Sequence, residues 1–578
     1  MVYCSRRAFM LISALASGEV LAHDRTGLTA TGMAADVVNP PPDLQSLIDQ
    51  ERERILEILK KDDIPGAAVC LHYRGKPLWI EGFGVTDRQS GRNVGTGTIF
   101  SIQSTSKNVA TTAIMLAVQH GLLDLDKPIN TYLPDFAVRS RFEQTPERKM
   151  TLRLLLSHRA GFTHEAPIGN NFDPTFPDFE THVKSISQTW LRYPVGERFA
   201  YSNLGIDLAG YILQTVSNKP FADCVKSLVF DPLGMSDSTA STDEYVDRAD
   251  RAVGQEKGYT EVPLKIPLIP SGGVYTSARD MAAYLTFHLN KGKFAGKTIL
   301  EEGLWREMHG FSLGGDYSLG VWREELRYGD TPIRMLHHPG GGFGFGSVFR
   351  LFPQAELGWV ALFNRTADAG YGLGAELQNA ILTRQYGEQK PRLPMQDLSA
   401  IDLPGAEMEK FIGNWRGRFL SRDIKLKDGE LGMQVGPAFW PLKFSSPKDV
   451  FMSKDVFMPL PRPQGEALTA EYFPESNART AYFLSPTGGT NLDYNDGPDD
   501  TPGPDRKEWD AYLGNYAIHL WGKLIEDVKV YRKNGYLYFG ELRLIVEEQP
   551  GLFFTCTGEA VDFRTAPVSV RNIRLVRT

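Results

Sequence analysis

Strand-like segments stand at both ends of residues 44–390, with a long helical stretch between them. After a helical pattern from Leu44, residues 64–87 contain two β-rich runs around a Tyr-Arg-Gly-Lys turn. Helical patterns and proline-rich loops dominate residues 100–260, and β-rich runs return in "SLGVWREEL", "FGSVFRLFP" and "LGWVALFN". The helical pattern "YGLGAELQNAILTRQYG" closes the region. This arrangement predicts one mixed sheet built from both ends of a single domain.

The chain has 578 residues, which is too long for one ordinary core. Beyond residue 390 it changes to short strand-like runs and turns. "EKFIGNWRGR" followed by "KLKDGELGM" is echoed by "DAYLGNYAIH" followed by "YRKNGYLYF", and each second segment holds Asp-Gly or Asn-Gly, which favour hairpins. We therefore predict two small antiparallel β modules, at 405–490 and 507–578. Residues 491–506, rich in Asp, Gly and Pro, are interpreted as an acidic linker.

The first residues resemble an export signal. "MVYCSRRAFMLISALASGEVLAHD" combines an arginine pair, a short apolar run and a small-residue end at Ala22, which predicts a signal peptide at 1–22 and a linker at 23–43. "SRRAFM" is similar to the twin-arginine type of signal, although Glu19 interrupts the apolar core. The alternative is a disordered N-terminus on a cytosolic protein. No other segment reaches the ~18–20 apolar residues of a membrane span, so we expect a periplasmic or secreted protein.

The composition of the chain limits the kinds of partner that the protein can bind. Hydrophobic residues make up 42% and charged residues 23% of the chain, as in globular proteins. A formal charge of −7 argues against nucleic acid as the main partner, because phosphate binding needs a basic face. Outside the predicted signal, the three cysteines are far apart and no Cys-x-x-Cys occurs, so we expect neither a disulfide framework nor a metal site. We expect no cofactor.

The stretch "FSIQSTSKNVATTAIML" places two polar residues with possible chemistry at the head of a buried helix. If Ser104 opens that helix, Lys107 lies one turn away on the same face, so the two side chains can touch. Serine is a poor nucleophile, and a lysine can accept its proton only if burial or a nearby cation lowers the lysine's pKa. The helix N-terminus would favour an oxyanion beside the serine. Alone, the pattern fits an ordinary capping serine better than a catalytic one.

Two further motifs follow in order along the chain. "GERFAYSNLGIDLAGYIL" contains Tyr201-Ser202-Asn203 between a turn and an apolar helix. "HHPGGGFGFGSVFRLF" contains His338-Pro339-Gly340, which leads into a β-rich run. The glycines of this segment would let a substrate approach the strand backbone closely. No Gly-x-Ser-x-Gly elbow, His-Glu-x-x-His motif or phosphate-binding glycine loop competes with these motifs.

Together these motifs resemble those of the penicillin-recognising serine hydrolases, in the branch of class C β-lactamases, D-Ala-D-Ala carboxypeptidases, D-aminopeptidases and related esterases. "LLLSHRAGF", "DPLGMSDS" and "SGGVYTSARDMAAYL" agree with that branch, and the resemblance covers roughly residues 44–390. It implies a β-lactamase-like α/β domain, in which helices flank an antiparallel sheet beside an all-helical lobe. The sheet would be antiparallel by resemblance, and mixed by pattern alone.

The resemblance also implies roles for individual residues. Ser104 would be the acylated nucleophile, with Lys107 and Tyr201 as the proton-transfer pair, and the lysine's charge would favour a tyrosine phenolate. Asn203 would hydrogen-bond Lys107 and the substrate amide. The N–H groups of Ser104 and Gly341 would form the oxyanion hole, next to Gly340 of the third motif. His158 and His164 are interpreted as ordinary polar histidines, and His337 as a structural neighbour.

His338 departs from the β-lactamases and carboxypeptidases, which usually place lysine here to bind a substrate carboxylate. Histidine is only partly charged near neutrality, and His-x-Gly is typical of D-aminopeptidases and esterases in this family. We therefore expect a peptidase acting on small linear peptides with D- or unusual residues; a relative in this superfamily cleaves linearised microcystin. An esterase of short acyl esters is the alternative enzyme. A cell-wall sensor that is acylated without turnover is the alternative from another class.

The C-terminal modules also fit the resemblance. D-aminopeptidases of this group carry two C-terminal antiparallel β-barrels, lipocalin-like in form, and a loop from one of them reaches the catalytic cleft. By this analogy the acidic residues Asp496, Asp499 and Asp500 could hold a substrate ammonium. A solvated linker is the alternative interpretation of the same stretch.

Overall fold

The computed structural model describes most residues from 42 onward. The described residues are 42–173, 175–197, 199–311, 313, 317–390, 400–401, 412–417, 421–435, 438–441, 444–445, 460–461, 467–468, 480–485, 488–495, 503–540, 542–555, 558–565 and 567–578. They belong to two compact units that divide between Gln389 and Lys390. The predicted signal peptide at 1–22, the linker up to residue 41 and the acidic residues Asp496, Asp499 and Asp500 lie outside the described residues.

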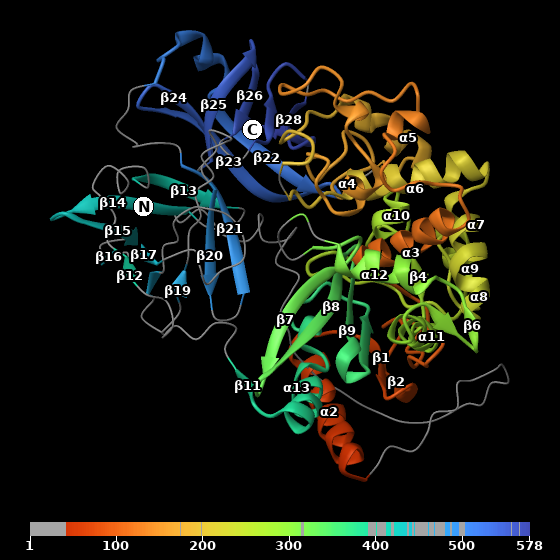
Figure 1. The fold of residues 1–578 in the computed structure, drawn as a ribbon. Coiled ribbons are helices and arrows are strands. Elements are labelled where there is room, and N and C mark those ends of the chain that lie inside the picture. Colours follow the sequence, from red (N-terminus) through yellow and green to blue (C-terminus); the bar gives the residue numbers. More distant parts are fainter. Residues whose placement is uncertain are drawn as a thin grey trace. The chain divides into compact units, whose positions relative to one another are not determined.

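The first unit is built on a seven-stranded sheet. Its order is β11 (Gln389–Lys390), β7 (Trp322–Tyr328), β8 (Thr331–Gly342), β9 (Phe345–Phe352), β10 (Leu357–Phe363), β1 (Gly66–Tyr73) and β2 (Lys76–Gly84). Ala67 of β1 pairs with Phe363 of β10, so the two ends of the domain meet in the middle of the sheet. Figure 1 shows the red strands β1 and β2 continuing the sheet of the green strands β7–β9.

The pairings from β7 to β2 are antiparallel. The sheet is therefore not the mixed one that the pattern of strands alone suggested, and it agrees with the antiparallel sheet that the family resemblance implied. Short connections explain the difference. Successive strands are joined directly to their neighbours, and a two-residue turn at Arg74 and Gly75, both at positive φ, closes the β1–β2 hairpin.

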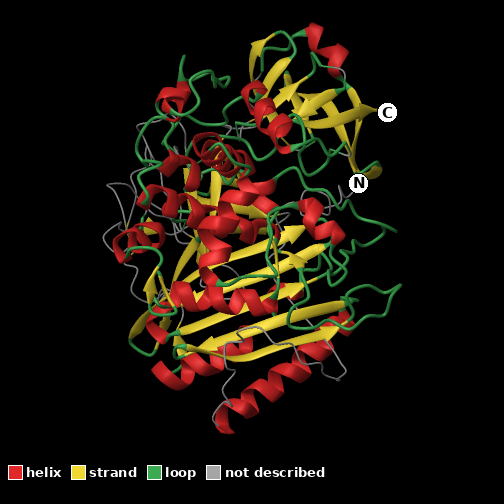
Figure 2. Cartoon of the chain, turned by 90° about the vertical axis from the view of Figure 1, so that its right-hand side faces the viewer, coloured by secondary structure: helices red, strands yellow, loops and turns green. Residues whose placement is uncertain are grey.

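Helices cover both faces of this sheet (Figure 2). One face presents alternate residues such as Val69, Trp359 and Phe363 to a core shared with α2 (Pro42–Lys61) and α13 (Ala375–Tyr386). The other face packs against α11 (Ala278–Leu289), where a Cβ on Gly358 would touch two leucines of that helix. Burial on both faces explains why β1 is a continuous apolar run. Helix α2 begins at Pro42, two residues before the predicted start, because proline suits the first helical position.

The chain between β2 and β7 is mainly helical. It forms α3 (Ser106–Gln119), α4 (Leu152–Leu156), α5 (Phe179–Ser185), α6 (Asn203–Ser217), α7 (Phe221–Val225), α8 (Asp231–Leu233), α9 (Thr242–Asp247), α10 (Ile269–Gly272), α11 and α12 (Glu302–Gly310). Two short strand pairs join them, β3 (Phe100–Ser101) with β4 (Tyr275–Thr276) and β5 (Lys293–Phe294) with β6 (Lys297–Thr298). Figure 1 shows α3 next to α6 and α10.

Helix α3 is buried from Ser106 to Ala117 although it contains several polar residues. The hydroxyls of Thr111 and Thr112 donate to the carbonyls of Lys107 and Asn108, four residues earlier. These bonds satisfy polar groups that would otherwise destabilise a buried helix. The predicted buried helix is thus present, and its two threonines are satisfied by bonds to its own backbone.

The described residues of the second unit form β-strands and one 3-10 helix, Lys507–Tyr512. A six-stranded antiparallel sheet has the order β16 (Ala438–Pro441), β15 (Glu430–Val435), β14 (Ser421–Lys427), β13 (Gly413–Gly417), β21 (Gly488–Asn495) and β20 (Thr480–Ser485). Two strand pairs accompany it, β12 (Ala400–Ile401) with β17 (Phe444–Ser445) and β18 (Leu460–Pro461) with β19 (Ala467–Leu468). The closed barrel contains β22 (Gly514–Leu520), β23 (Lys523–Lys533), β24 (Tyr536–Phe539), β25 (Leu542–Gln549), β26 (Leu552–Thr555), β27 (Ala560–Asp562), β28 (Val568–Val570) and β29 (Ile573–Arg577).

The repeated sequence segments fold as matching hairpins, one in the six-stranded sheet and one in the closed barrel. Asp428 and Gly429 turn the chain between β14 and β15, and Asn534 and Gly535 do the same between β23 and β24, all four at positive φ. That conformation matches the twist of the flanking strands. The barrel closes because β29 pairs with β22. Among the described residues, no helix combines the length and apolar character that crossing a membrane requires.

Candidate active site

Ser104 lies in a single 3-10 turn, Gln103–Thr105, directly before α3. It therefore precedes the α-helix by two residues and does not open it as the sequence pattern suggested. The turn depends on Gln103, which has a φ of 47° although it is not glycine, and whose side chain donates to the Ser101 hydroxyl. Such a conformation costs ~1–3 kcal/mol and persists only where the surroundings hold it. The backbone before Ser104 is thus held in a sharp bend.

Lys107 is fully buried and its ammonium has three acceptors. The Nζ atom is 3.2 Å from Ser104 Oγ, 2.7 Å from Asn203 Oδ1 and 2.8 Å from the Ser271 carbonyl oxygen. The amide oxygen and the carbonyl can only accept hydrogen bonds. A neutral amine would give its two hydrogens to these two oxygens, and its lone pair would face Ser104. The site therefore suits both protonation states of Lys107.

A buried carboxylate fixes the position of one of these acceptors. Asp207, on α6 one turn after Asn203, accepts from the Ser271 N–H and hydroxyl, both at 2.9 Å. His182 Nε2 lies 3.2 Å from the same carboxylate. Helix α6 thus positions Lys107 twice, directly through Asn203 and indirectly through the α10 residue Ser271.

Tyr201 lies against Lys107, with Nζ 4.9 Å from the ring centroid. Five other rings surround it, those of His158, His164, Tyr317, Trp322 and His338. The centroids of His158, His164 and Trp322 lie 4.4, 5.7 and 6.4 Å from that of Tyr201, and the last two rings are stacked on it. The structure therefore brings Ser104, Lys107, Tyr201 and Asn203 together, as the motifs predicted. The aromatic packing holds the Tyr201 ring in one orientation.

His158 and His164, which the sequence analysis interpreted as ordinary polar histidines, both pack on Tyr201. His164 Nδ1 is 2.7 Å from the carboxylate of Glu165, which also accepts from Asn171. These partners outweigh burial and lower the pKa of Glu165 to about 2, so the carboxylate stays ionised. The available signal was "LLLSHRAGFTHEAP", residues 154–167, in which these two histidines and one acidic residue fall close together.

The ends of β8 and β9 are held against the turn of Ser104. The Thr105 hydroxyl donates to the carbonyl of His338 at 2.9 Å, and the Ser347 hydroxyl donates to the carbonyl of Ile102 at 2.8 Å. The two hydroxyls also lie 2.8 Å apart. These bonds fix the third motif relative to the predicted nucleophile.

Glycine at position 340 is required by this close approach. A Cβ there would lie 2.1 Å from the carbonyl oxygen of Ile102 and 2.5 Å from the hydroxyl of Ser347. Gly341 follows, paired with Gly346 of β9 at the half-exposed end of β8. The strand can therefore run directly beside the Ser104 turn, which is the placement that an oxyanion hole between Ser104 and Gly341 needs.

His338 is buried, and both of its ring nitrogens have partners. Nδ1 lies 2.8 Å from the Pro339 carbonyl oxygen and Nε2 lies 3.0 Å from the Tyr317 hydroxyl. Burial, and then the charge of Lys107, hold the pKa of His338 well below its usual value. The neighbouring His337 points to a different partner, with Nε2 3.1 Å from Glu324.

The family model described as Beta-lactamase matches residues 44–382, more than half of the chain. The protein belongs to this β-lactamase family. Its fold class is the β-lactamase-like α/β domain followed by a closed C-terminal β-barrel domain. Relatives in the family are serine hydrolases, so membership makes this β-lactamase-family protein a hydrolase.

Curated relatives are similar over about half of this β-lactamase-family chain. "D-alanyl-D-alanine-carboxypeptidase/endopeptidase AmpH" of Escherichia coli is 24% identical over 51% of the chain and 78% of its own length. "Unguisins hydrolase ungD'" of Aspergillus campestris is 25% identical over 56% of the chain and 63% of its own length. "Esterase EstB" of Burkholderia gladioli is 26% identical over 36% of the chain and 54% of its own length.

Solved structures extend the similarity beyond the catalytic domain. The crystal structure of SurE with D-Leu has a TM-score of 0.53 at 20% identity, covering 78% of this chain and 98% of that one. The octameric penicillin-binding protein homologue from Pyrococcus abyssi has a TM-score of 0.50 at 20% identity, covering 78% of this chain and 99% of that one. At this identity the likeness shows the fold alone.

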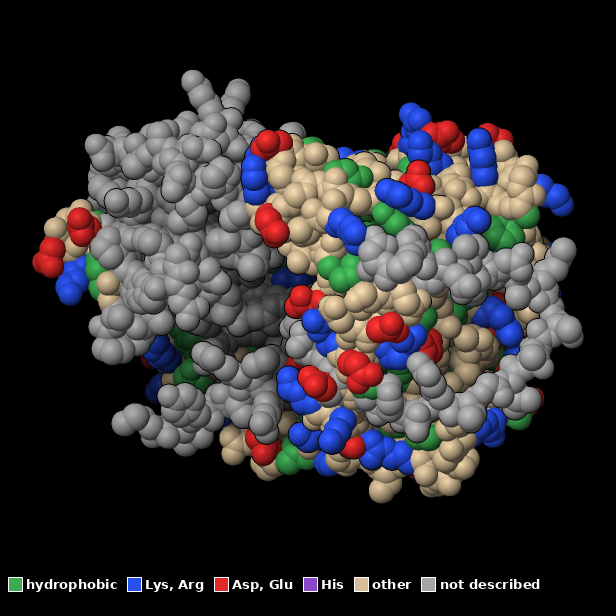
Figure 3. Space-filling view, turned by 90° about the horizontal axis from the view of Figure 1, so that it is seen from below, with side chains coloured by type: hydrophobic (Ala, Val, Ile, Leu, Met, Phe, Trp, Pro, Cys, Tyr) green, Lys and Arg blue, Asp and Glu red, His purple; other side chains and the backbone are tan. Residues whose placement is uncertain are grey.

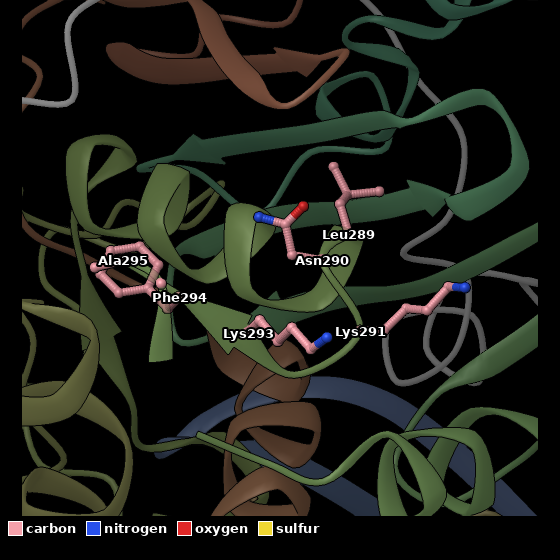
Figure 4. A pocket seen from close by; sticks show the side chains of 7 residues that line it. Leu289, Asn290, Lys291, Lys293, Phe294 and Ala295 are labelled. Atoms are coloured by element: carbon pink, nitrogen blue, oxygen red, sulfur yellow. The ribbon is translucent and has the colours of Figure 1, made fainter. Parts of the chain in front are cut away.

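The structure also has a surface pocket that none of the site residues lines. Figure 4 shows a surface pocket at the end of α11, lined by Leu289, Asn290, Lys291, Lys293, Phe294, Ala295 and Gly296. It includes no residue of the three motifs. Among the described residues on the face seen in Figure 3, Lys and Arg side chains are interspersed with Asp and Glu. The described residues contain no His, Cys, Asp and Glu cluster that could hold a metal ion.

Proposed function

We propose that this β-lactamase-family hydrolase forms an acyl-enzyme at Ser104 and hydrolyses small linear peptides, including peptides with D- or other unusual residues. The position of Lys107 carries the proposal. Its Nζ lies 3.2 Å from Ser104 Oγ while its other two contacts are acceptor oxygens. A buried lysine held in this way can take the serine proton without a histidine.

The reaction follows from this arrangement. Ser104 Oγ attacks the substrate carbonyl carbon, and its proton passes to the neutral amine of Lys107, with Tyr201 beside it as the second member of the pair. The tetrahedral oxyanion lies at the N–H groups of Ser104 and Gly341. The C–N bond then breaks, the leaving amine takes the proton, and an ester between Ser104 and the acyl group remains. Water attacks that ester, and the released serine regains its proton.

Two observations favour peptides as substrates. The relatives named as a D-alanyl-D-alanine carboxypeptidase/endopeptidase and as an unguisins hydrolase share the catalytic region with this chain. The third motif also carries His338 in place of the lysine that serves carboxylate recognition in the β-lactamases. The relative named as an esterase supports the alternative, hydrolysis of short acyl esters.

A panel of substrates tests the proposal. Purified protein is incubated with a D-aminoacyl anilide, a set of linear peptides, a nitrophenyl ester and a fluorescent penicillin, beside the Ser104→Ala variant. We expect peptide or anilide cleavage by the unchanged protein alone. Ester cleavage without amide cleavage would favour the esterase, and stable penicillin labelling without turnover of any substrate would establish the sensor.

We also propose export across the cytoplasmic membrane, with the signal removed near Ala22. The arginine pair, apolar run and small-residue end of the first residues support this location. N-terminal sequencing of the protein from a cell-fractionation experiment tests it. A mature start just after Ala22 in the periplasm or medium is expected, and an intact Met1 in the cytosol would contradict it.

A further inference from the structure

His182, in the middle of α5, has both ring nitrogens next to acceptor oxygens. Nδ1 lies 2.9 Å from the carbonyl oxygen of Ile168, and Nε2 lies 3.2 Å from Oδ2 of Asp207. A carbonyl and an ionised carboxylate can only accept hydrogen bonds, so each nitrogen needs a hydrogen to bond its partner. An imidazolium satisfies both acceptors, and as an imidazolium His182 forms an ion pair with Asp207.

The other hydrogen bonds of Asp207 favour its ionised form. Its Oδ1 accepts from the N–H of Ser271 and its Oδ2 accepts from the hydroxyl of the same residue, both at 2.9 Å. A carboxylate that accepts several hydrogen bonds is favoured over its protonated form. The side chains of His182 and Asp207 are both fully buried, where a single charge is costly and a partner of opposite charge offsets the cost.

The packing around His182 holds its ring in this position. The ring stacks on that of Phe179, with the centroids 6.5 Å apart. Gly169 has a φ of 70°, and a Cβ there would lie 3.2 Å from both Cβ and Nδ1 of His182, so glycine lets the loop close on the ring. The Ile168 N–H donates to the hydroxyl of Ser185, which ties the same loop to α5. The imidazole can therefore bond both acceptors at once.

The ion pair is connected to Lys107 through a single residue. Asp207 fixes Ser271 by two hydrogen bonds, and the carbonyl oxygen of Ser271 lies 2.8 Å from Lys107 Nζ. His182 gives the same carboxylate a third donor, which is charged. Hydrogen bonds between ionised groups are about twice as strong as those between neutral groups. The orientation of the carboxylate, on which Ser271 and Lys107 depend, is therefore set in part by His182.

We propose that His182 is a positioning residue for Lys107, acting as an imidazolium that orients the carboxylate of Asp207. The carboxylate holds Ser271, and the Ser271 carbonyl holds the lysine. This inference rests on the proposed hydrolase function, because it adds a residue to the same site. The role belongs to Nε2, which faces Asp207, whereas Nδ1 anchors the loop at Ile168.

Two substitutions separate the two nitrogens of His182. A glutamine amide can reach the position of Nε2 and an asparagine amide that of Nδ1. His182→Gln therefore keeps a donor for Asp207, and His182→Asn keeps only the bond to Ile168. We expect kcat to fall on the order of tenfold in His182→Asn and by less than about threefold in His182→Gln. KM should change little in either variant, because the interaction that is lost acts on the lysine and not on bound substrate.

The order of the two variants distinguishes a role in catalysis from a role in folding. If His182 only anchored the loop, His182→Asn would be the more active variant, and that result would overturn the proposal. Equal kcat values in the two variants would also overturn it and would leave the hydrolase function standing. Lys184→Gln is the matched control on α5, because this exposed lysine pairs with Glu180 on the same helix, and it should leave kcat unchanged.

A spectroscopic readout tests the imidazolium without any turnover. In nitrogen-15 spectra of histidine-labelled protein at pH 7, the His182 signals, assigned by their loss in His182→Gln, should show both ring nitrogens protonated. If that variant does not fold, the signals are assigned by their change in Asp207→Asn. A neutral His182 ring in the unchanged protein would overturn the inference, even if substrates are cleaved. The imidazolium spectrum with no turnover of any substrate would instead count against the hydrolase function.

Discussion

Asp207 accepts two hydrogen bonds from Ser271, one from its N–H and one from its hydroxyl, each at 2.9 Å. The carbonyl of Ser271 is in turn an acceptor for Lys107. A carboxylate that does not contact the predicted nucleophile therefore sets the position of the lysine beside it. This relationship makes α6 and α10 parts of the site although only α6 carries a recognised motif.

We predict that Asp207→Asn lowers kcat on the order of 10²-fold, because an amide cannot accept from both Ser271 donors and Lys107 shifts away from Ser104. Steady-state kinetics on the best substrate of the panel measure the loss. Asp231→Asn is the control, since this exposed aspartate pairs with Lys226 far along the chain from the motifs. Equal activity of the two variants would show that the hydrogen bonds from Ser271 to Asp207 are not needed to position Lys107.

The N-cap of α6 should affect both stability and turnover. Ser202 Oγ accepts from the Leu204 N–H and donates to the Thr163 carbonyl. Ser202→Ala should cost ~1 kcal/mol of unfolding free energy and also lower kcat, because α6 carries Asn203. Ser241→Ala removes the N-cap of α9 at a similar cost. Urea unfolding and kinetics on both variants test the difference, and a fall in kcat with Ser241→Ala would contradict it.

Gly340→Ala should inactivate the protein. Its methyl group would overlap the Ile102 carbonyl oxygen, forcing β8 away from the Ser104 turn. We expect a stability loss of ~1–3 kcal/mol and a fall in kcat on the order of 10²-fold. Gly303→Ala is the matched control on α12, where nothing lies within 4 Å of the added Cβ. Wild-type kinetics in Gly340→Ala would mean that the third motif does not need this close approach.

Three buried histidines should make the first unit sensitive to acid. Burial lowers the pKa of His72 and of His309 to about 4 and holds that of His288 well below its usual value. The unfolded chain takes up these protons near pH 6.5 and the folded chain only at lower pH. The stability that these groups contribute is therefore full above pH 6.5 and falls as the pH drops toward 4.

His72→Leu tests this pH dependence, because neither His72 ring nitrogen has a hydrogen-bond partner among the described residues. The unfolding midpoint in urea at pH 7.5 and at pH 5 should differ less in this variant than in the unchanged protein. His120→Gln is the control at an exposed histidine. An unchanged pH dependence of the unfolding midpoint in His72→Leu would show that burial of His72 does not cause the loss of stability in acid.

Local patterns predicted much of the fold. The Asp-Gly and Asn-Gly turns have the positive φ angles that their residue types favour. Strand direction in the sheet was not readable from the pattern, because a continuous apolar run such as β1 occurs in any sheet that is buried on both faces. The antiparallel sheet came from the family resemblance alone.

The motifs predicted the residues that meet around Lys107, but not what holds them. Asp207 and Tyr317 are not residues of the three motifs, and Ser271 only begins the accessory phrase "SGGVYTSARDMAAYL"; each of the three makes a tertiary hydrogen bond between segments far apart in the sequence. Spacing along a chain carries no information on such bonds. The acidic residues Asp496, Asp499 and Asp500 stay a prediction, since they lie outside the described residues.

Trapping the covalent intermediate tests the central claim most directly. Protein mixed with substrate is quenched in acid within one turnover and its mass is measured, followed by peptide mapping. The account predicts one acyl group on Ser104, no adduct in Ser104→Ala, and a loss of turnover in that variant by more than about a thousandfold. An adduct on another residue, or activity of Ser104→Ala within about tenfold of the unchanged protein, would contradict it.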